Sequence, residues 1–251
     1  EVDTGLHLML VLDMAASLEA PLEVRFACLC HDLGKGTTPP DILPRHLGHE
    51  QRSVELLRGL CQRLRVPAEC RELAEVVARE HGHVHRSGEF GPAAVVRLLE
   101  RCDAFRRPQR FEQILLACEC DARGRLGLER QPYAPRPRLL AALRAAQGVC
   151  TALVAEEALA RGLQGPRIAQ AIHEARARAV AAAQMVGLDI AGVDIVCKNV
   201  LRPLEEQGGA IVELNAAPGL RMHLQPSYGK GRPVGEAIIA NMFADGDDAR
   251  I

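Results

Sequence analysis

The sequence predicts a mainly α-helical protein that ends in a small α/β segment. Up to about residue 183, apolar residues recur at helical spacing, and prolines and glycines bound the apolar runs. Beyond that point, two short runs rich in β-branched residues are bounded by turn residues. We therefore expect a helical bundle over 1–183 and an incomplete α/β segment over 184–251, with the junction between about 175 and 187.

The helices are expected in order along the first segment. Asp3 or Thr4 can cap a first helix through 5–18, and Pro21 can open a second helix that runs to Gly34. Further helices are predicted over 49–64, 67–82, 92–104, 108–122, 138–162 and 166–185. In the second segment, strands are expected in "LDIAGVDIVCKN" and "GGAIVELNAAPG", with a short helix near 233–243.

Composition excludes several classes of protein. A hydrophobic content of 48% over 251 residues is ample for a core, so the chain is not a disordered protein. No apolar run approaches the roughly 18 residues of a membrane span, and no signal peptide opens the chain. The nine cysteines lie mostly in helical runs without zinc-site spacing, which favours reduced thiols. We expect a cytoplasmic protein with no membrane partner, and the first residue, Glu1, suggests a fragment or processed piece.

The charge pattern leaves two interpretations open. The net charge of −1 predicts no nucleic-acid partner for the chain as a whole. Between Arg101 and Arg144, however, ten arginines face five acidic residues, and this local excess suits phosphates. The same arginines could equally lie on solvated helix faces.

The histidines are the strongest chemical signal. Seven of the nine lie in the first 85 residues, namely His7, His31, His46, His49, His81, His83 and His85. His31 and Asp32 end an apolar run in "ACLCHDLGKG", where buried polar groups need partners. Imidazole nitrogens with carboxylates suit a divalent first-row metal, which activates water for attack on a phosphate ester.

These residues resemble a known superfamily. His7, then His31-Asp32, then a later aspartate follows the H…HD…D order of the HD phosphohydrolases. The segments "EVDTGLH", "RFACLCHDLGKGTTPP", "PRHLGHE", "LCQRLRVP", "CDAFRRPQRFEQ" and "DARGRLG" are similar to the C-terminal HD domain of bacterial tRNA nucleotidyltransferases of the multifunctional CCA type. The resemblance covers residues 1 to about 183.

The resemblance implies a set of site residues. The metal ligands would be His7, His31, Asp32 and Asp121, and the catalytic residues would be His31, Asp32, Lys35, His49 and His81. His49 and His81 could hold a second metal or act as phosphate and proton-transfer partners. Asp103 is the alternative to Asp121 as the last aspartate of the motif, but we expect Asp103 to cap a helix.

The resemblance also implies an activity. The expected reaction is hydrolysis of 2′,3′-cyclic phosphates, 2′-nucleotides and other phosphomonoesters with nickel, manganese, cobalt or magnesium. RNA ends or tRNA would contact Arg106, Arg107, Arg110, Arg123 and Arg125. No paired-carboxylate motif for nucleotide addition occurs, so CCA addition by this chain alone is not expected. A non-catalytic tRNA-binding module is the alternative that rests on the arginines alone.

The second segment resembles another enzyme family. "GLDIAGVDIV" and "GGAIVELNAAPGLRMH" are similar to the end of the ATP-grasp domain of cyanophycin synthetase and, more distantly, to D-alanine–D-alanine ligase. Asp194, Glu213 and Asn215 would then hold Mg²⁺ against ATP. The earlier half of that fold is absent, so Mg-ATP is expected only if another chain completes the site. A fragment of an ATP-dependent amide ligase remains an alternative, and two unlike resemblances suggest a composite or fused chain.

Overall fold

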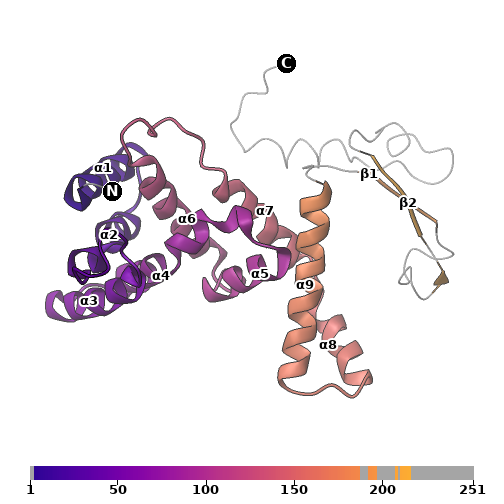
Figure 1. Ribbon diagram of the computed structural model, residues 1–251. Coiled ribbons are helices and arrows are strands. Elements are labelled where there is room, and N and C mark those ends of the chain that lie inside the picture. The colour runs from indigo at the N-terminus through magenta and orange to yellow at the C-terminus, as the bar shows by residue number, and fades with distance from the viewer. Residues whose placement is uncertain (1–2, 187–191, 197–206, 209, 216–251) are drawn as a thin grey trace. The chain divides into compact units, whose positions relative to one another are not determined.

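The computed structural model describes residues 3–186, 192–196, 207–208 and 210–215. Two compact units are present, Glu1–Ala182 and Ala183–Ile251, and Figure 1 shows the helices of the first unit and the two strands of the second. The helix expected near 233–243 lies outside the described residues.

The first unit is helical, as predicted from the apolar spacing. Its α-helices are α1 (Thr4–Ser17), α2 (Leu22–Cys30), α3 (His49–Leu64), α4 (Ala68–His85), α5 (Pro92–Arg101), α6 (Pro108–Arg123), α7 (Pro135–Gln147), α8 (Thr151–Ala160) and α9 (Pro166–Val186), the last of which crosses the boundary. Two short 3₁₀ turns, η1 (Leu33–Thr37) and η2 (Ser87–Glu89), follow α2 and α4. The Asp3 carboxylate caps α1 by accepting the backbone N–H groups of Gly5 and Leu6 at 2.8 and 3.0 Å.

Two helix predictions were wrong in their bounds. The helix expected from Pro21 to Gly34 ends at Cys30 and gives way to η1. The Gly34 N–H donates to Ser53 Oγ at 2.8 Å, so a tertiary partner on α3 replaces the helical acceptor. The helix expected over 138–162 is two helices, α7 and α8, because Gly148 ends the first and Cys150 is extended (φ −73°, ψ 92°).

The core of the first unit forms where α2, α4 and α6 meet. Helix α4 packs against α2, α3 and α6, while α1 packs against α2 and α6, and the ribbon shows α1, α2 and α4 grouped beside α6 (Figure 1). Phe111, Leu57, Leu73 and Leu115 are fully buried. His7, His31, His81 and Asp121 are buried with them, so this core contains polar groups that need partners.

In the second unit, the described residues form two strands, β1 (Gly192–Val196) and β2 (Ala210–Asn215). The strands are antiparallel, and their register pairs Asp194 with Glu213 and Gly192 with Asn215. An ATP-grasp fold is not shown by this pair of strands.

The described residues contain no single helix that is long and apolar enough to cross a membrane. Within the part of the chain that the structure describes, one bent pair of helices, α7 and α8, reaches that length and composition together.

Candidate metal centre

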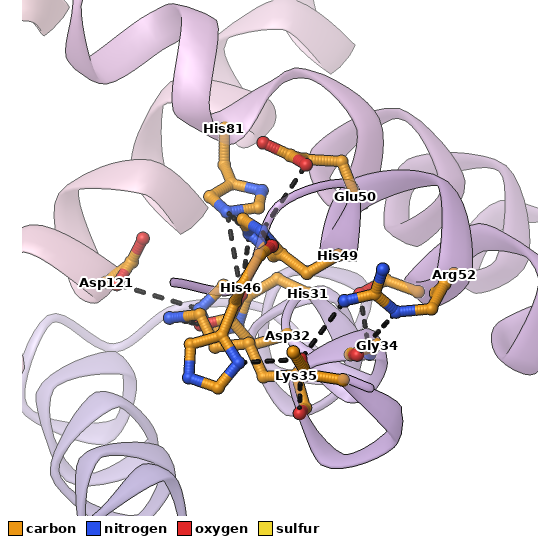
Figure 2. A network of polar contacts seen from close by, with 12 residues as sticks. His31, Asp32, Gly34, Lys35, His46, His49, Glu50, Arg52, His81 and Asp121 are labelled. Carbon is orange, nitrogen blue, oxygen red and sulfur yellow. Dashed lines mark hydrogen bonds and ion pairs between the residues drawn. The ribbon is translucent and has the colours of Figure 1, made fainter. Parts of the chain in front are cut away.

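Five elements of the first unit bring polar side chains to one place. His7 comes from α1, His31 and Asp32 follow α2 directly, and His49 is the first residue of α3. His81 and Asp121 come from α4 and α6, and their side chains converge with those of His31 and Asp32 (Figure 2). The predicted metal ligands and the predicted catalytic histidines therefore lie in a single cluster.

Backbone carbonyls orient the imidazoles in this cluster. A carbonyl oxygen only accepts hydrogen bonds, so a ring nitrogen that contacts one must carry the proton. In four of the described histidines that nitrogen is Nδ1, which leaves Nε2 to face the centre. The four contacts are His7 to Gly124 (3.1 Å), His31 to Cys28 (2.8 Å), His49 to His46 (2.8 Å) and His81 to Val77 (3.0 Å).

The Nε2 atoms lie close to two carboxylates. His31 Nε2 lies 3.2 Å from Asp32 Oδ2 and 3.6 Å from Asp121 Oδ1, and His7 Nε2 lies 2.9 Å from Asp121 Oδ1. His49 Nε2 and His81 Nε2 lie 3.3 and 3.6 Å from Asp32 Oδ1. Two groups of possible ligands result, His7–His31–Asp121 and Asp32–His49–His81, and the ligand atoms within each lie within 4.8 Å of one another.

These atoms fit a divalent cation. Among the described residues, His31 Nε2 and Asp32 Oδ1 are buried and have no hydrogen-bond partner. The Nε2 atoms of His49 and His81 are only 3.4 Å apart, although both rings already donate through Nδ1. In neutral rings, two lone pairs would face one another at that distance. Buried lone pairs that converge without donors are the arrangement that a metal ion satisfies.

The pKa values describe how the cluster balances its charge without a cation. Burial alone would lower the pKa of His31, but the close negative charges of Asp121 and Asp32 outweigh burial and raise that pKa to about 10. Burial and the neighbouring charge of His31 lower the pKa of His81 to about 4. His31 is therefore held in the protonated form and His81 in the neutral form.

Both carboxyl groups are held in the ionised form. Burial would raise the pKa of Asp32, yet His31, His81 and Lys35 hold it well below its usual range. Burial acts in the same direction on Asp121, but its close contacts with His31, His7 and His85 keep the pKa of this carboxyl far below normal. Two carboxylates are thus available as oxygen ligands.

Lys35 lies beside the cluster, as expected, but its partner is protein. Its Nζ is 2.6 Å from Asp32 Oδ2. A pocket of about 410 Å³ lies at this side of the cluster. Its lining is partly cationic and consists of Lys35, His46, Leu47, Gly48, His49, Glu50 and Arg86. Because His49 and Lys35 both contact Asp32 and both line the pocket, the cluster reaches solvent here.

Sequence reasoning missed two residues at the centre. His85 Nε2 lies 2.7 Å from Asp121 Oδ2, and the Tyr133 hydroxyl lies 2.8 Å from His85 Nδ1. The spacing of His85 from His81 places both on one face of a helix, and this signal could have included His85 in the site. Tyr133 lies 48 residues beyond His85 in a connecting segment, where no local pattern identifies it.

The arginines expected to bind RNA are engaged in ion pairs. Arg106 and Arg110 lie 2.6 and 3.4 Å from carboxylate oxygens of Asp103, and Arg107 lies 2.7 Å from Glu72. The expectation that Asp103 caps a helix was wrong, because Asp103 has φ 55° and binds these arginines instead. Arg106 and Arg107 are exposed, and exposed ion pairs are weak, so their role as RNA contacts stays a prediction.

The other two arginines lie near the end of α6. Arg123 binds Glu119 at 2.7 Å, and Arg125 lies 3.5 Å from Asp121 Oδ1. Arg125 is therefore close to the cluster, whereas Arg123 stabilises the helix through a pair one turn apart.

The residues expected to bind Mg²⁺ in the second unit lie on its two strands. Asp194 is on β1, while Glu213 and Asn215 are on β2. The backbone register pairs Asp194 directly with Glu213. Their role as magnesium ligands stays a prediction.

A comparison with protein families decides the class of the helical unit. Residues 4–118 match the family described as HD domain. This part of the chain is therefore similar to HD domains. HD domains form a superfamily of metal-dependent phosphohydrolases, so the prediction of an enzyme domain of this class is confirmed. Asp121 lies three residues beyond the matched range, although it contacts three histidines inside that range.

The relatives of the chain are bacterial proteins called multifunctional CCA proteins. The protein from Polaromonas naphthalenivorans (strain CJ2) is 73% identical over 180 residues, which cover 72% of this chain and 42% of the relative. Those from Acidovorax sp. (strain JS42) and Cupriavidus metallidurans (strain CH34) are 68% and 60% identical over 181 residues, covering 72% of this chain and 43% of each relative.

The chain spans less than half the length of these curated relatives. No solved structure matches it. The resemblance of residues 184–251 to ATP-grasp ligases receives no support from the comparisons.

Proposed function

We propose that the HD domain hydrolyses phosphate esters of nucleotides and RNA ends with a divalent metal held by His7, His31, Asp32 and Asp121. The observation that carries this proposal is the convergence of four oriented imidazoles on the carboxylates of Asp32 and Asp121, where His31 Nε2 and Asp32 Oδ1 are buried without a hydrogen-bond partner. Leaving such atoms unpaired costs about 1–3 kcal/mol each, and a bound cation would offset that cost.

Residues of the chain would also bind the phosphate and transfer protons. His7 and Asp121 belong to the more buried group of ligands, whereas His49 and Lys35 are partly exposed and line the pocket. When bound, the metal would act as a Lewis acid on the phosphoryl group and favour attack by water. Lys35 would offer its ammonium group to phosphate oxygens, and His49 would take a proton at Nε2 from the attacking water and pass it to the leaving oxygen.

The pocket supports a phosphate ester of about nucleotide size. It has a volume of about 410 Å³ and contains the cationic side chains of Lys35 and Arg86, against one acidic residue, Glu50. We propose 2′,3′-cyclic phosphates, 2′-nucleotides and small phosphomonoesters as substrates. Because the relatives are called CCA proteins, we also propose the 3′ end of tRNA as the physiological context. Nickel, manganese, cobalt and magnesium are the proposed metals, since ligand type alone does not separate them.

Hydrolysis of 2′,3′-cyclic AMP tests the proposal. The full chain would be treated with EDTA and assayed with Ni²⁺, Mn²⁺, Co²⁺ or Mg²⁺ added separately. We expect turnover with at least one metal and a loss of at least about 100-fold in Asp32→Ala, which removes a ligand. Asp41→Ala, an exposed aspartate in the following loop, is the matched control and should retain activity. A folded protein that binds metal but hydrolyses no phosphate ester would contradict the proposal.

A further inference from the structure

We infer that His85 is not a metal ligand but a positioning residue, and that the Tyr133 hydroxyl fixes it in this role by donating to Nδ1 and holding the ring in place. Tyr133 would thus act as the outermost member of a chain of hydrogen bonds, Tyr133–His85–Asp121. This inference rests on the proposed metal centre, because it concerns how Asp121 is held ready for the cation.

His85 differs from the other imidazoles of the cluster in its hydrogen bonds. His7, His31, His49 and His81 donate Nδ1–H to backbone carbonyls. His85 has no such carbonyl contact among the described residues; its Nδ1 meets a hydroxyl at 2.8 Å and its Nε2 meets a carboxylate at 2.7 Å. Among the described residues, the backbone carbonyl that holds the Nδ1 proton in the other four rings therefore has no counterpart at His85, whose Nδ1 faces a hydroxyl.

The contact with Asp121 decides where the proton lies. A separation of 2.7 Å between Nε2 and Oδ2 is a hydrogen bond only if Nε2 carries the proton, because the ionised carboxylate offers none. In a neutral ring Nδ1 is then an acceptor, and Tyr133 donates its O–H to it. Burial raises the pKa of Tyr133, so the phenol keeps its proton as a donor.

The two carboxylate oxygens of Asp121 have different partners. Oδ2 accepts from His85, while Oδ1 faces His7 at 2.9 Å and His31 at 3.6 Å. With Oδ2 held, the carboxylate cannot rotate, and Oδ1 stays directed at the cluster. Outer partners that fix a ligand in this way commonly contribute 10- to 100-fold to metal affinity.

Removal of the hydroxyl should therefore weaken the site without removing a ligand. In Tyr133→Phe, His85 Nδ1 loses its donor, while the Asp121 carboxylate keeps the proton on Nε2. The buried Nδ1 lone pair is then unpaired, the ring is no longer held from its outer side, and the hydrogen bond that holds Asp121 Oδ2 weakens. The proposed arrangement predicts weaker metal binding, whereas an imidazole acting as ligand through Nε2 would bind as well or better once released.

Calorimetric titration of the EDTA-treated full chain with Mn²⁺ tests the inference. We expect Tyr133→Phe to weaken binding by about 10-fold or more. His85→Gln, whose amide can still donate to Asp121, should retain most of the affinity that His85→Ala loses. Ser17→Ala, which removes a hydroxyl from the end of α1, is the matched control and should bind like the unaltered protein. Thermal melting without metal identifies any variant that fails to fold.

Two results would overturn the inference. One is unchanged or tighter binding in Tyr133→Phe, which would show that the hydroxyl does not hold the site. The other is a loss in His85→Gln as large as that in His31→Ala, which would make His85 a ligand. The failure of the proposed function looks different, because the unaltered protein would then bind no metal or hydrolyse no ester.

Discussion

The close contact between η1 and α3 gives the most direct test of how the fold builds the site. Gly34 is the point of contact: its N–H donates to Ser53 Oγ at 2.8 Å, and its carbonyl accepts from Arg52 Nε at 3.1 Å. A Cβ atom added at Gly34 would overlap the carbonyl oxygen of His49 and lie 2.6 Å from Ser53 N. Both neighbours are backbone atoms, so neither can move without shifting the start of α3.

The size of the effect follows from these distances. Ordinary contacts of a Cβ atom begin near 3.4 Å, so Gly34→Ala requires η1 and α3 to separate by about 1 Å. Overpacking of this kind destabilises a protein by about 1–3 kcal/mol, and the melting temperature should fall by several degrees. Since His49 starts α3 and Asp32 precedes η1, the same shift separates two residues of the centre. A misplacement of about 1 Å reduces turnover by roughly 100-fold.

Gly36→Ala is the matched control in the same turn. A Cβ atom at Gly36 meets no atom within 4 Å, so this variant should melt and react like the unaltered protein. The assays are thermal melting and hydrolysis of 2′,3′-cyclic AMP at saturating metal. If Gly34→Ala were as stable and active as Gly36→Ala, the close approach would not be what positions His49, and the reasoning would fail.

Three further predictions follow from the same contacts. Arg86→Ala should raise KM for a phosphate ester about 10-fold with little change in kcat or metal affinity, because Arg86 lines the pocket but contacts no proposed metal ligand among the described residues. A loss in kcat as large as the rise in KM would refute this role. Arg101→Ala should lower the free energy of unfolding by on the order of 3 kcal/mol, because the side chain of Glu80, only 2% exposed, loses its guanidinium partner at 3.0 Å. Urea denaturation measures this loss, and Arg58→Ala, at an exposed ion pair, is the near-neutral comparison. Metal affinity should rise about 10-fold per pH unit between pH 6 and 9, because a cation must displace the proton from His31, whose pKa is raised to about 10; a plateau above pH 7 in calorimetric titrations would contradict it.

The sequence predicted the helical unit well because its signals are local. Proline opens α5 and α6, Asp3 caps α1, and the apolar spacing covers the rest. The bounds failed where tertiary contacts replaced local ones, as at Gly34, where an oxygen of Ser53 takes the place of a helical carbonyl. Such a partner lies 19 residues away and leaves no mark on the local pattern.

The site was predictable where spacing or resemblance named its residues. His31 and Asp32 are adjacent in the sequence, and the resemblance named Asp121 and His7, which lie 114 residues apart. Tyr133 carried no such signal, since an aromatic residue in a connecting segment is ordinarily assigned to packing. The function of the hydroxyl is visible only when His85, on another element, lies within hydrogen-bonding distance.

The end of α6 shows how packing turns separate residues into one centre. A Cβ atom at Gly124 would lie 2.6 Å from Val11 Cα, so only glycine lets this end of α6 approach α1 so closely. The approach does two things at once: it brings Asp121 Oδ1 to 2.9 Å from His7 Nε2, and it places the Gly124 carbonyl where His7 Nδ1 donates to it. The glycine in "DARGRLG" therefore orients a proposed ligand through its backbone while it carries no chemistry of its own. Residues of this kind explain why a list of histidines and aspartates identifies the centre but does not by itself specify its geometry.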